Sequence, residues 1–190
     1  MLLLRVILFL GLVTHKLVWE ILKKRDGGAP QPAQAPISLL KWLVKQGKVL
    51  FLVFILIQTL FLNLLPISDE PFYIQVLGFV LFFAGLATAI IGRLQLGNNW
   101  ANLEDYDSLQ KSNLVNTGIY RFIRHPIYAG DILMLVGLEL ALNSWLVLLM
   151  LVPMLVVIRQ TTAEEALLAQ SFPNYVDYRM RTKRFIPFVI

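Results

Sequence analysis

Five apolar runs separated by polar segments limit what this chain can fold into. Three of them, residues 2–22, 49–65 and 72–91, are close to the roughly 20 residues that a helix needs to cross a bilayer. Inside lipid the backbone finds no water, so runs of this length are expected to be helices that satisfy their own hydrogen bonds. The sequence therefore predicts an all-α integral membrane protein with five transmembrane helices.

The last two apolar runs, residues 127–142 and 145–158, are joined only by Asn143 and Ser144. So short a connection predicts that transmembrane helices 4 and 5 form a tight antiparallel hairpin. The second run is short and contains Pro153, so it can kink or stop inside the bilayer. Both ends of the hairpin then return to the same side of the membrane.

Composition agrees with a lipid environment. Hydrophobic residues make up 57% of the chain and charged residues only 15%, whereas about a quarter of an average soluble domain is charged. The absence of cysteine excludes a disulfide framework and a thiolate metal site, and no metal site is expected. The net charge of +5 comes from basic residues beside the apolar runs, which favours anionic lipid headgroups over nucleic acid as partners.

Basic residues also indicate the orientation in the membrane. They lie between the first and second runs and after the third, whereas the loop that carries Asp69 and Glu70 has none. The positive-inside rule then predicts that the N-terminus is outside and that the C-terminus is cytoplasmic. The residues that carry this bias are Lys23, Lys24, Arg25, Lys41, Lys45, Lys48, Arg93, Lys111, Arg121 and Arg124.

The polar segments divide the chain into two predicted parts. Residues 1–94 hold three N-terminal transmembrane helices with a cytoplasmic linker at 23–48. Residues 95–190 form a catalytic region, in which the 95–117 loop and the C-terminal helices make a cytoplasmic cap on the 127–158 hairpin.

Local signals predict three shorter helices outside the spans. Residues 37–46 are typical of an interfacial helix, with Ser38 as its N-cap. In the tail, Thr162 is a candidate N-cap for a helix whose first turn holds Glu164 and Glu165. Pro173 is expected to open a second tail helix.

The polar hinge at residues 118–130, where the fourth run begins, is the strongest candidate for chemistry. Pro126 suits the first position of a helix, whose unpaired N–H groups attract a carboxylate or a phosphate. The hairpin returns Glu164 and Glu165 to the same membrane depth. A helix N-terminus and a basic cluster beside carboxylates can hold a zwitterion, with its carboxylate on the N–H groups and its ammonium on a glutamate.

Each of these residues also has a plainer interpretation. The hinge can be a juxtamembrane anchor, with arginines on lipid phosphate and tyrosine in the aromatic belt. Asp131 lies inside an apolar run, where an ionisable residue suggests function, but it can equally pair with Arg124 or Arg121. On the first run, His15 is expected to be an interfacial or helix-contact residue.

Motifs in the second half of the chain carry a resemblance to a known family. They are Leu114-Val115-Asn116-Thr117-Gly118-Ile119-Tyr120, Arg124-His125-Pro126-Ile127-Tyr128, Glu164-Glu165, Phe172, Tyr175, Tyr178 and Ile186-Pro187-Phe188. Together they resemble the isoprenylcysteine carboxyl methyltransferase family, in its prokaryotic form, and membrane phospholipid methyltransferases are similar. The resemblance covers roughly residues 99–188.

The resemblance implies a methyltransferase with S-adenosylmethionine as cofactor and S-adenosylhomocysteine as product. The cofactor-binding residues that it implies are Ser112, Asn113, Leu114, Val115, Tyr120, His125, Pro126, Ile127, Tyr128, Glu164 and Glu165. The family has an arginine four residues before the first glutamate, thought to face the substrate carboxylate, where this sequence has Gln160 and, one position earlier, Arg159. Arg159 and Arg124 are therefore the catalytic candidates.

Two methyl acceptors stay open, each carried by a lipid or a prenylated molecule that enters from the bilayer. The carboxylate of an isoprenylcysteine-like substrate needs orientation, first by Arg159, rather than a base. A phospholipid amine must first lose a proton to a base, for which Asp131, Glu165 and His125 are the options. A membrane sterol or enone reductase with a nicotinamide cofactor and a non-enzymatic membrane scaffold are the remaining alternatives.

Overall fold

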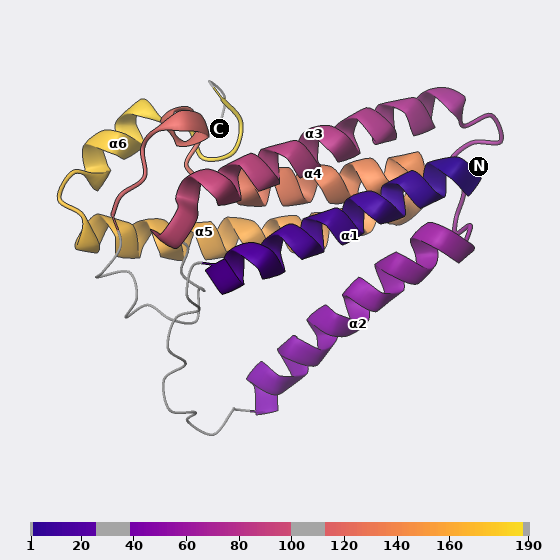
Figure 1. Cartoon of the computed structure of the whole chain (residues 1–190), viewed down its shortest axis with the longest axis horizontal. Coiled ribbons are helices and arrows are strands. Elements are labelled where there is room, and N and C mark those ends of the chain that lie inside the picture. Colours follow the sequence, from indigo (N-terminus) through magenta and orange to yellow (C-terminus); the bar gives the residue numbers. More distant parts are fainter. Residues whose placement is uncertain (1, 26–38, 100–112, 188–190) are drawn as a thin grey trace.

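The computed structural model describes residues 2–25, 39–99 and 113–187, and in this part of the chain the regular elements are helices (Figure 1). Helices α1 (Leu2–Arg25), α3 (Phe72–Leu96), α4 (Pro126–Ala141) and α5 (Leu151–Ser171) lie side by side, while α2 (Leu39–Phe61) diverges from them. Short 3-10 turns η1 (Gly97–Asn99), η3 (Gly118–Arg121) and η4 (Trp145–Met150) and the helix α6 (Tyr175–Arg181) complete the fold. The all-α prediction is confirmed for these residues.

Three of the described helical segments are long and apolar enough to cross a membrane. They are Leu2–Arg25, Phe72–Asn99 and Trp145–Ser171. The apolar part of α2, Val49–Phe61, is shorter, and α4 has 16 residues. The chain therefore has the helices of a membrane protein, while five complete crossings and the paired crossing of helices 4 and 5 stay predictions.

Small residues bring the backbones of α3 and α4 into direct contact. Gly78, Gly85 and Gly92 are seven residues apart, nearly two helical turns, so they share one face of α3. A Cβ atom on Gly85 would overlap the backbone of Met134, and one on Gly137 of α4 would overlap the backbone of Phe82. The close approach fixes the N-terminus of α4 beside the C-terminal end of α3.

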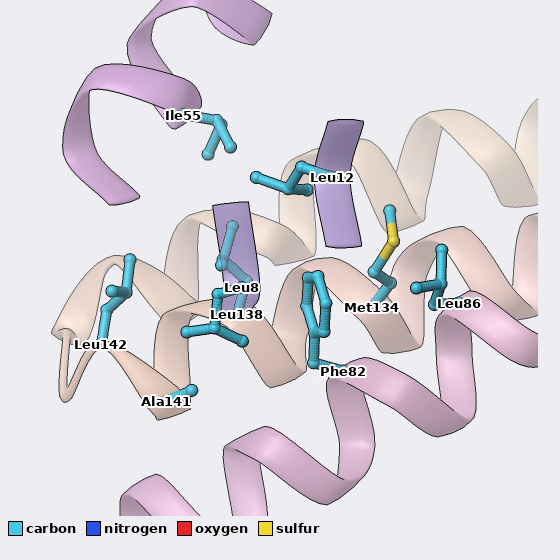
Figure 2. Packing of buried hydrophobic residues seen from close by; sticks show 9 residues of the cluster. All are labelled: Leu8, Leu12, Ile55, Phe82, Leu86, Met134, Leu138, Ala141 and Leu142. Carbon is cyan, nitrogen blue, oxygen red and sulfur yellow. The ribbon is translucent and has the colours of Figure 1, made fainter. Parts of the chain in front are cut away.

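The apolar core fills the space between α1, α2, α3 and α4 (Figure 2). Phe82 and Leu138 are fully enclosed at its centre, and Leu8 of α1 packs into the same cluster. Figure 2 labels the whole set: Leu8, Leu12, Ile55, Phe82, Leu86, Met134, Leu138, Ala141 and Leu142. The core lies away from the polar hinge, which leaves the start of α4 for polar side chains.

A buried arginine attaches α1 to the end of α2. The Arg5 guanidinium donates from Nη1 to the carbonyls of Gln58 and Thr59, both at 3.1 Å, and from Nη2 to that of Leu62 at 3.0 Å. Carbonyl groups in the last turn of a helix have no partner within the helix, so Arg5 satisfies them. The Gln58 amide in turn donates to the buried carboxylate of Glu139 at 2.8 Å, which links α2 to α4.

Two predicted helix boundaries are wrong. Helix α2 runs without a break from Leu39, so residues 37–46 are not a separate interfacial helix; Ser38 lies outside the described residues. Helix α5 continues to Ser171, and the Thr162 hydroxyl donates to the Ile158 carbonyl at 2.8 Å instead of capping a new helix. In both places the sequence turns from apolar to polar, which marks the edge of the lipid. The helix itself continues, because no glycine–proline pair or other strong helix breaker occurs there.

Candidate functional site

The site is built on the start of α4. His125 is the N-cap residue, Pro126 opens the helix, and the first backbone bond runs from the Ala129 N–H to the His125 carbonyl at 3.0 Å. The N–H groups of Ile127 and Tyr128 precede that bond, and the His125 side chain does not cap them. A helix start that its N-cap side chain does not cap is the arrangement that the sequence predicts for an anion.

The C-terminal segment lies against this helix start. The N–H groups of Arg124 and His125 donate to the carbonyls of Lys183 and Arg184, at 2.8 and 3.1 Å. In return the Lys183 N–H donates to the Phe122 carbonyl at 3.1 Å. This short parallel pairing brings the side chain of Arg184 to the site.

Glu165 is enclosed by three cationic or potentially cationic side chains. Its carboxylate accepts from Arg124 Nε at 2.9 Å, from His125 Nε2 at 3.1 Å and from Arg184 Nη2 at 2.8 Å. Only 4% of the Glu165 side chain is exposed. With both of its oxygens bound, Glu165 holds α5, the hinge and the C-terminal segment together.

Glu164 lies beside Glu165 but keeps an open oxygen. Its Oε2 is 4.0 Å from His125 Nδ1, and the Tyr128 hydroxyl hydrogen-bonds the same carboxylate. That Oε2 atom is buried and accepts no hydrogen bond from the described residues. The predicted meeting of His125 with the acidic segment is confirmed, and a buried carboxylate oxygen without a donor suits an ammonium group.

Three tyrosines, Tyr120, Tyr175 and Tyr178, lie near the hinge and are linked by a hydrogen bond and a ring contact. The Tyr120 hydroxyl donates to the Gly92 carbonyl at 3.3 Å, and the Tyr178 hydroxyl donates to the Tyr120 carbonyl at 2.8 Å. Burial raises the pKa of Tyr120, Tyr175 and Tyr178 well above the usual value of 10.0. All three are therefore neutral hydrogen-bond donors at physiological pH rather than bases.

The predicted cofactor segment before the hinge lines a cavity. Asn113 and Leu114 border a space of about 280 Å³ together with Asn116, Phe172, Pro173 and Asn174. Val115 is half-buried beside them in sequence, and Ser112 lies outside the described residues. The structure thus joins part of this segment to the turn between α5 and α6.

The two arginines predicted to be catalytic lie in different surroundings. Arg159 is exposed on α5, on the same side as the exposed Thr162 and Ala163. The Arg124 guanidinium is only 10% exposed and is occupied by Glu165 and by the carbonyls of Arg179 and Thr182. Contact of either arginine with a substrate stays a prediction.

Asp131 does not pair with Arg121 or Arg124. Its Oδ1 lies 2.9 Å from Nε2 of His15, which reaches it from α1. The alternative of a pair with either arginine is therefore wrong, because spacing along the sequence cannot show which neighbouring helix covers Asp131. The expectation that His15 is a helix-contact residue is confirmed. On the same helix, Lys16 pairs with Glu20 at 2.7 Å.

Sequence reasoning missed Arg184 as a member of the site. Nothing in the local sequence distinguishes Arg184 from Lys183 or Arg181. What selects it is the backbone pairing of Lys183 and Arg184 with the hinge, a long-range contact that no local motif records.

Comparisons with known proteins recognise a region that holds the hinge and both glutamates of the site but not Arg184. A family model described as phospholipid methyltransferase matches residues 73–175. Relatives include the cobalt-zinc-cadmium resistance protein CzcN of Cupriavidus metallidurans, 36% identical over 109 residues, and the nickel-cobalt-cadmium resistance protein NccN of Alcaligenes xylosoxydans xylosoxydans, 37% identical over 109 residues. Each alignment covers 54% of this chain and 46% of the relative, so the chain spans about half the length of the curated relatives it matches.

Proposed function

We propose a function from one premise: this chain belongs to the phospholipid methyltransferase family, whose model matches residues 73–175. Membership and the three apolar helices together indicate a membrane methyltransferase. The methyl donor that we propose is S-adenosylmethionine, which supplies an electrophilic sulfonium methyl group. The acceptor that we propose is carried by a lipid-embedded molecule.

The unpaired Oε2 atom of Glu164 is the observation that carries this proposal. The amino-acid end of the donor is a zwitterion, so its ammonium group would bind Glu164. Its carboxylate would bind the N–H groups of Ile127 and Tyr128 at the start of α4. Glu165 is saturated by its own partners, so its part would be to hold His125 and Arg124 in place.

Titration calorimetry of the detergent-solubilised protein with S-adenosylhomocysteine tests the donor without any need for the acceptor. We expect binding by the natural chain, and we expect Glu164→Gln to weaken it about 10- to 100-fold, the loss of one charge-assisted hydrogen bond. Glu20→Gln, at an exposed carboxylate on α1, is the matched control and should bind normally. A natural chain that shows no heat of binding would reject the proposal.

For the acceptor, our first candidate is the carboxylate of an isoprenylcysteine-like substrate. A carboxylate is already ionised near pH 7, so the site has only to orient it for in-line attack on the methyl group. Arg159 is exposed and can make this contact. The guanidinium of Arg124 is already paired with Glu165, which disfavours its binding to a substrate carboxylate. Arg159→Ala should then slow methylation of farnesylcysteine while leaving S-adenosylhomocysteine binding unchanged.

A phospholipid amine is the second candidate, and the family match favours it. An amine is mostly protonated near pH 7, so its methylation should accelerate as pH rises, whereas methylation of a carboxylate should change little. Rates measured from pH 6 to pH 9 with each acceptor in the same vesicles would separate the two chemistries. The family match supports neither a reductase nor a scaffold without activity.

We also propose on which side of the membrane the site lies. The excess of lysine and arginine around the ends of α1 and α3 that lie near the hinge supports a cytoplasmic site and an N-terminus outside. The lipid tail of the acceptor would stay in the bilayer and its head would enter sideways between helices. Such an entry explains why the site is built at the end of a membrane bundle.

A further inference from the structure

A second polar pair lies deeper in the bundle than the Glu164 site. His15 of α1 and Asp131 of α4 are joined at 2.9 Å between Nε2 and Oδ1. Their side chains are 20% and 35% exposed, so the pair is reachable from outside the protein. Both residues lie within apolar helices, where ionisable side chains are costly and usually functional.

The geometry of the pair fixes the chemistry of the imidazole. With Nε2 turned to the carboxylate, the neutral ring places its proton on Nε2 and its lone pair on Nδ1. Trp19 stacks on the ring with centroids 4.1 Å apart, which holds its plane. An imidazole that is oriented by a carboxylate and keeps a free ring nitrogen is the arrangement of a general base.

The pair lies close to the place where the acceptor would meet the methyl donor. Asp131 is three residues, less than one turn or about 4.5 Å of helix rise, beyond Tyr128. Tyr128 in turn hydrogen-bonds Glu164. The Glu164–Tyr128 and Asp131–His15 pairs therefore lie about one helical turn apart along α4.

The other candidate bases are already bound. Glu165 and His125 hold each other and are further tied by Arg124 and Arg184. If Asp131 itself acted as the base, its carboxylate would have to break its hydrogen bond with His15. The second ring nitrogen of His125, Nδ1, faces the Glu164 carboxylate at 4.0 Å, in the proposed donor site, whereas Nδ1 of His15 forms no hydrogen bond with the described residues.

We propose that His15, oriented by Asp131, is the general base that accepts the proton of a lipid ammonium group before methyl transfer. The ammonium gives one proton to His15 Nδ1, and its nitrogen keeps the electron pair. That pair forms the new bond to the methyl carbon while the carbon–sulfur bond breaks and its electrons stay on sulfur. The methylated nitrogen carries the positive charge away, and the His15 proton leaves to water. This role rests on the proposed function with an amine acceptor.

Among the described residues, few other charged groups face the His15–Asp131 pair. On α1, Lys16 and Glu20 pair with each other at 2.7 Å. Asp131 is the carboxylate from α4, α3 brings Arg93 near its C-terminal end, and the described side chains of α2 include none that is charged. The pH dependence of the reaction should therefore follow the His15–Asp131 pair.

Nitrogen-15 NMR of histidine in the ligand-free protein gives a test that does not depend on activity. The chain has only two histidines, so His15→Gln assigns both signals. We expect His15 to be the Nε2-protonated tautomer near pH 7.5, and we expect Asp131→Asn to change its tautomer or its titration. A His15 protonated on Nδ1, or one indifferent to Asp131→Asn, would overturn the assignment.

Methylation rates supply the second readout. With phosphatidylethanolamine vesicles, His15→Gln should lower kcat at pH 7 about 100-fold or more and regain rate as rising pH deprotonates the amine itself. Asp131→Asn should cost a similar factor, and the double variant little more, because the two residues act as a unit. Glu20→Gln should behave as the natural chain.

The outcomes separate this role from the proposed function. Normal binding of S-adenosylhomocysteine by His15→Gln, together with the lost rate, supports the base. An unchanged pH profile in His15→Gln, or transfer only to the carboxylate of farnesylcysteine, overturns the base and leaves the methyltransferase intact. Failure of the natural chain to bind S-adenosylhomocysteine instead rejects the proposed function. If His15→Gln does not fold, Asp131→Asn and the NMR signals of the natural chain decide the question.

Discussion

Two adjacent glutamates show how much a single side chain depends on its partners. Glu165 has both oxygens bound by Arg124, His125 and Arg184, whereas Glu164 keeps one buried oxygen without a donor. The two residues have the same chemistry and differ only by the 100° turn between neighbours on a helix. That turn directs one carboxylate to the structural network and the other to the predicted cofactor.

Removing the charge of Glu165 should destabilise the fold. We expect Glu165→Gln to lower the free energy of unfolding by about 3 kcal/mol, because Arg124 stays buried without its partner. The value is at the low end for a buried pair because 26% of Arg184 is exposed to solvent. Denaturant unfolding in detergent would measure the loss. Glu20→Gln should cause no measurable change, and equal stability of the two variants would contradict the account.

The buried tyrosines predict a loss of stability in alkali. Because the pKa values of Tyr120, Tyr175 and Tyr178 are raised in the folded state, their contribution is complete below about pH 10, the usual value, and is lost as pH rises through the folded pKa. The unfolding free energy should therefore fall above pH 10, and less steeply in Tyr178→Phe. Phenolate absorbance at 295 nm would follow the titration; complete ionisation of the three near pH 10 in folded protein would contradict this.

Part of the candidate site can be predicted from the sequence, and part of it cannot. The hinge sequence and the Glu-Glu pair are local signals, and they led to His125, Tyr128 and Glu164 before any contact was known. Arg184 and His15 were not assigned to sites because their roles arise from packing between segments distant in the chain. Local motifs predict which residues lie at the start of α4. They do not predict which residues from distant segments pack around that helix start.

At the scale of helices, the contact between α3 and α4 is the part that can least tolerate change. Glycines on both helices let the backbones touch, and this contact sets the position of His125 at the start of α4. The sequence analysis located both helices from their apolar runs. It missed the glycine pairing, because a glycine that allows close packing and one in an uncrowded helix look alike in a sequence.

Gly85 and Gly47 provide a matched comparison. A Cβ atom at Gly85 would overlap backbone atoms of Met134 and Gly130, which cannot move aside as a side chain can, whereas nothing lies within 4 Å of a Cβ at Gly47. We expect Gly85→Ala to destabilise the protein by about 2–3 kcal/mol. Gly47→Ala should stabilise it by up to about 1 kcal/mol through helix propensity. Thermal unfolding in detergent would compare them, and a neutral Gly85→Ala would refute the close contact.

Helix ends were the least predictable part of the elements. The apolar runs place α1 and α3 well, but α2 and α5 continue through polar residues at 39–48 and 159–171. Hydropathy records where lipid ends, whereas the backbone continues its hydrogen bonds until a turn residue or a tertiary contact stops it. Hydropathy therefore predicts where a helix leaves the lipid, and not where the helix ends.

At the scale of the molecule, polar contacts join α1 to the bundle at two depths. Arg5 binds the end of α2, and His15 binds Asp131 on α4. Residues 73–175 match the family model, so α1 with Arg5 and His15 lies outside that region, whereas Asp131 lies inside it. The proposed base would then join a residue outside the matched region to a carboxylate inside it.

The absence of cysteine makes the orientation in the membrane simple to test. Single substitutions Glu70→Cys, in the loop before α3, and Lys23→Cys, at the end of α1, each introduce the only thiol of the chain. In intact cells a membrane-impermeant maleimide should label Glu70→Cys from outside, and it should reach Lys23→Cys only after lysis. The reverse pattern would place the site on the other side of the membrane.

The pairing of the C-terminal segment with the hinge has a consequence for biosynthesis. Arg124 binds a carbonyl 58 residues further along the chain, so the ribosome must make all of α4, α5 and α6 before that bond can form. Until then a nascent chain inserted in the membrane holds Glu165 with an incomplete set of counter-charges. Maturation of this enzyme would be a late event that follows translation of residue 184, and helper proteins of the insertion machinery would meet an unfinished, charged end of the bundle.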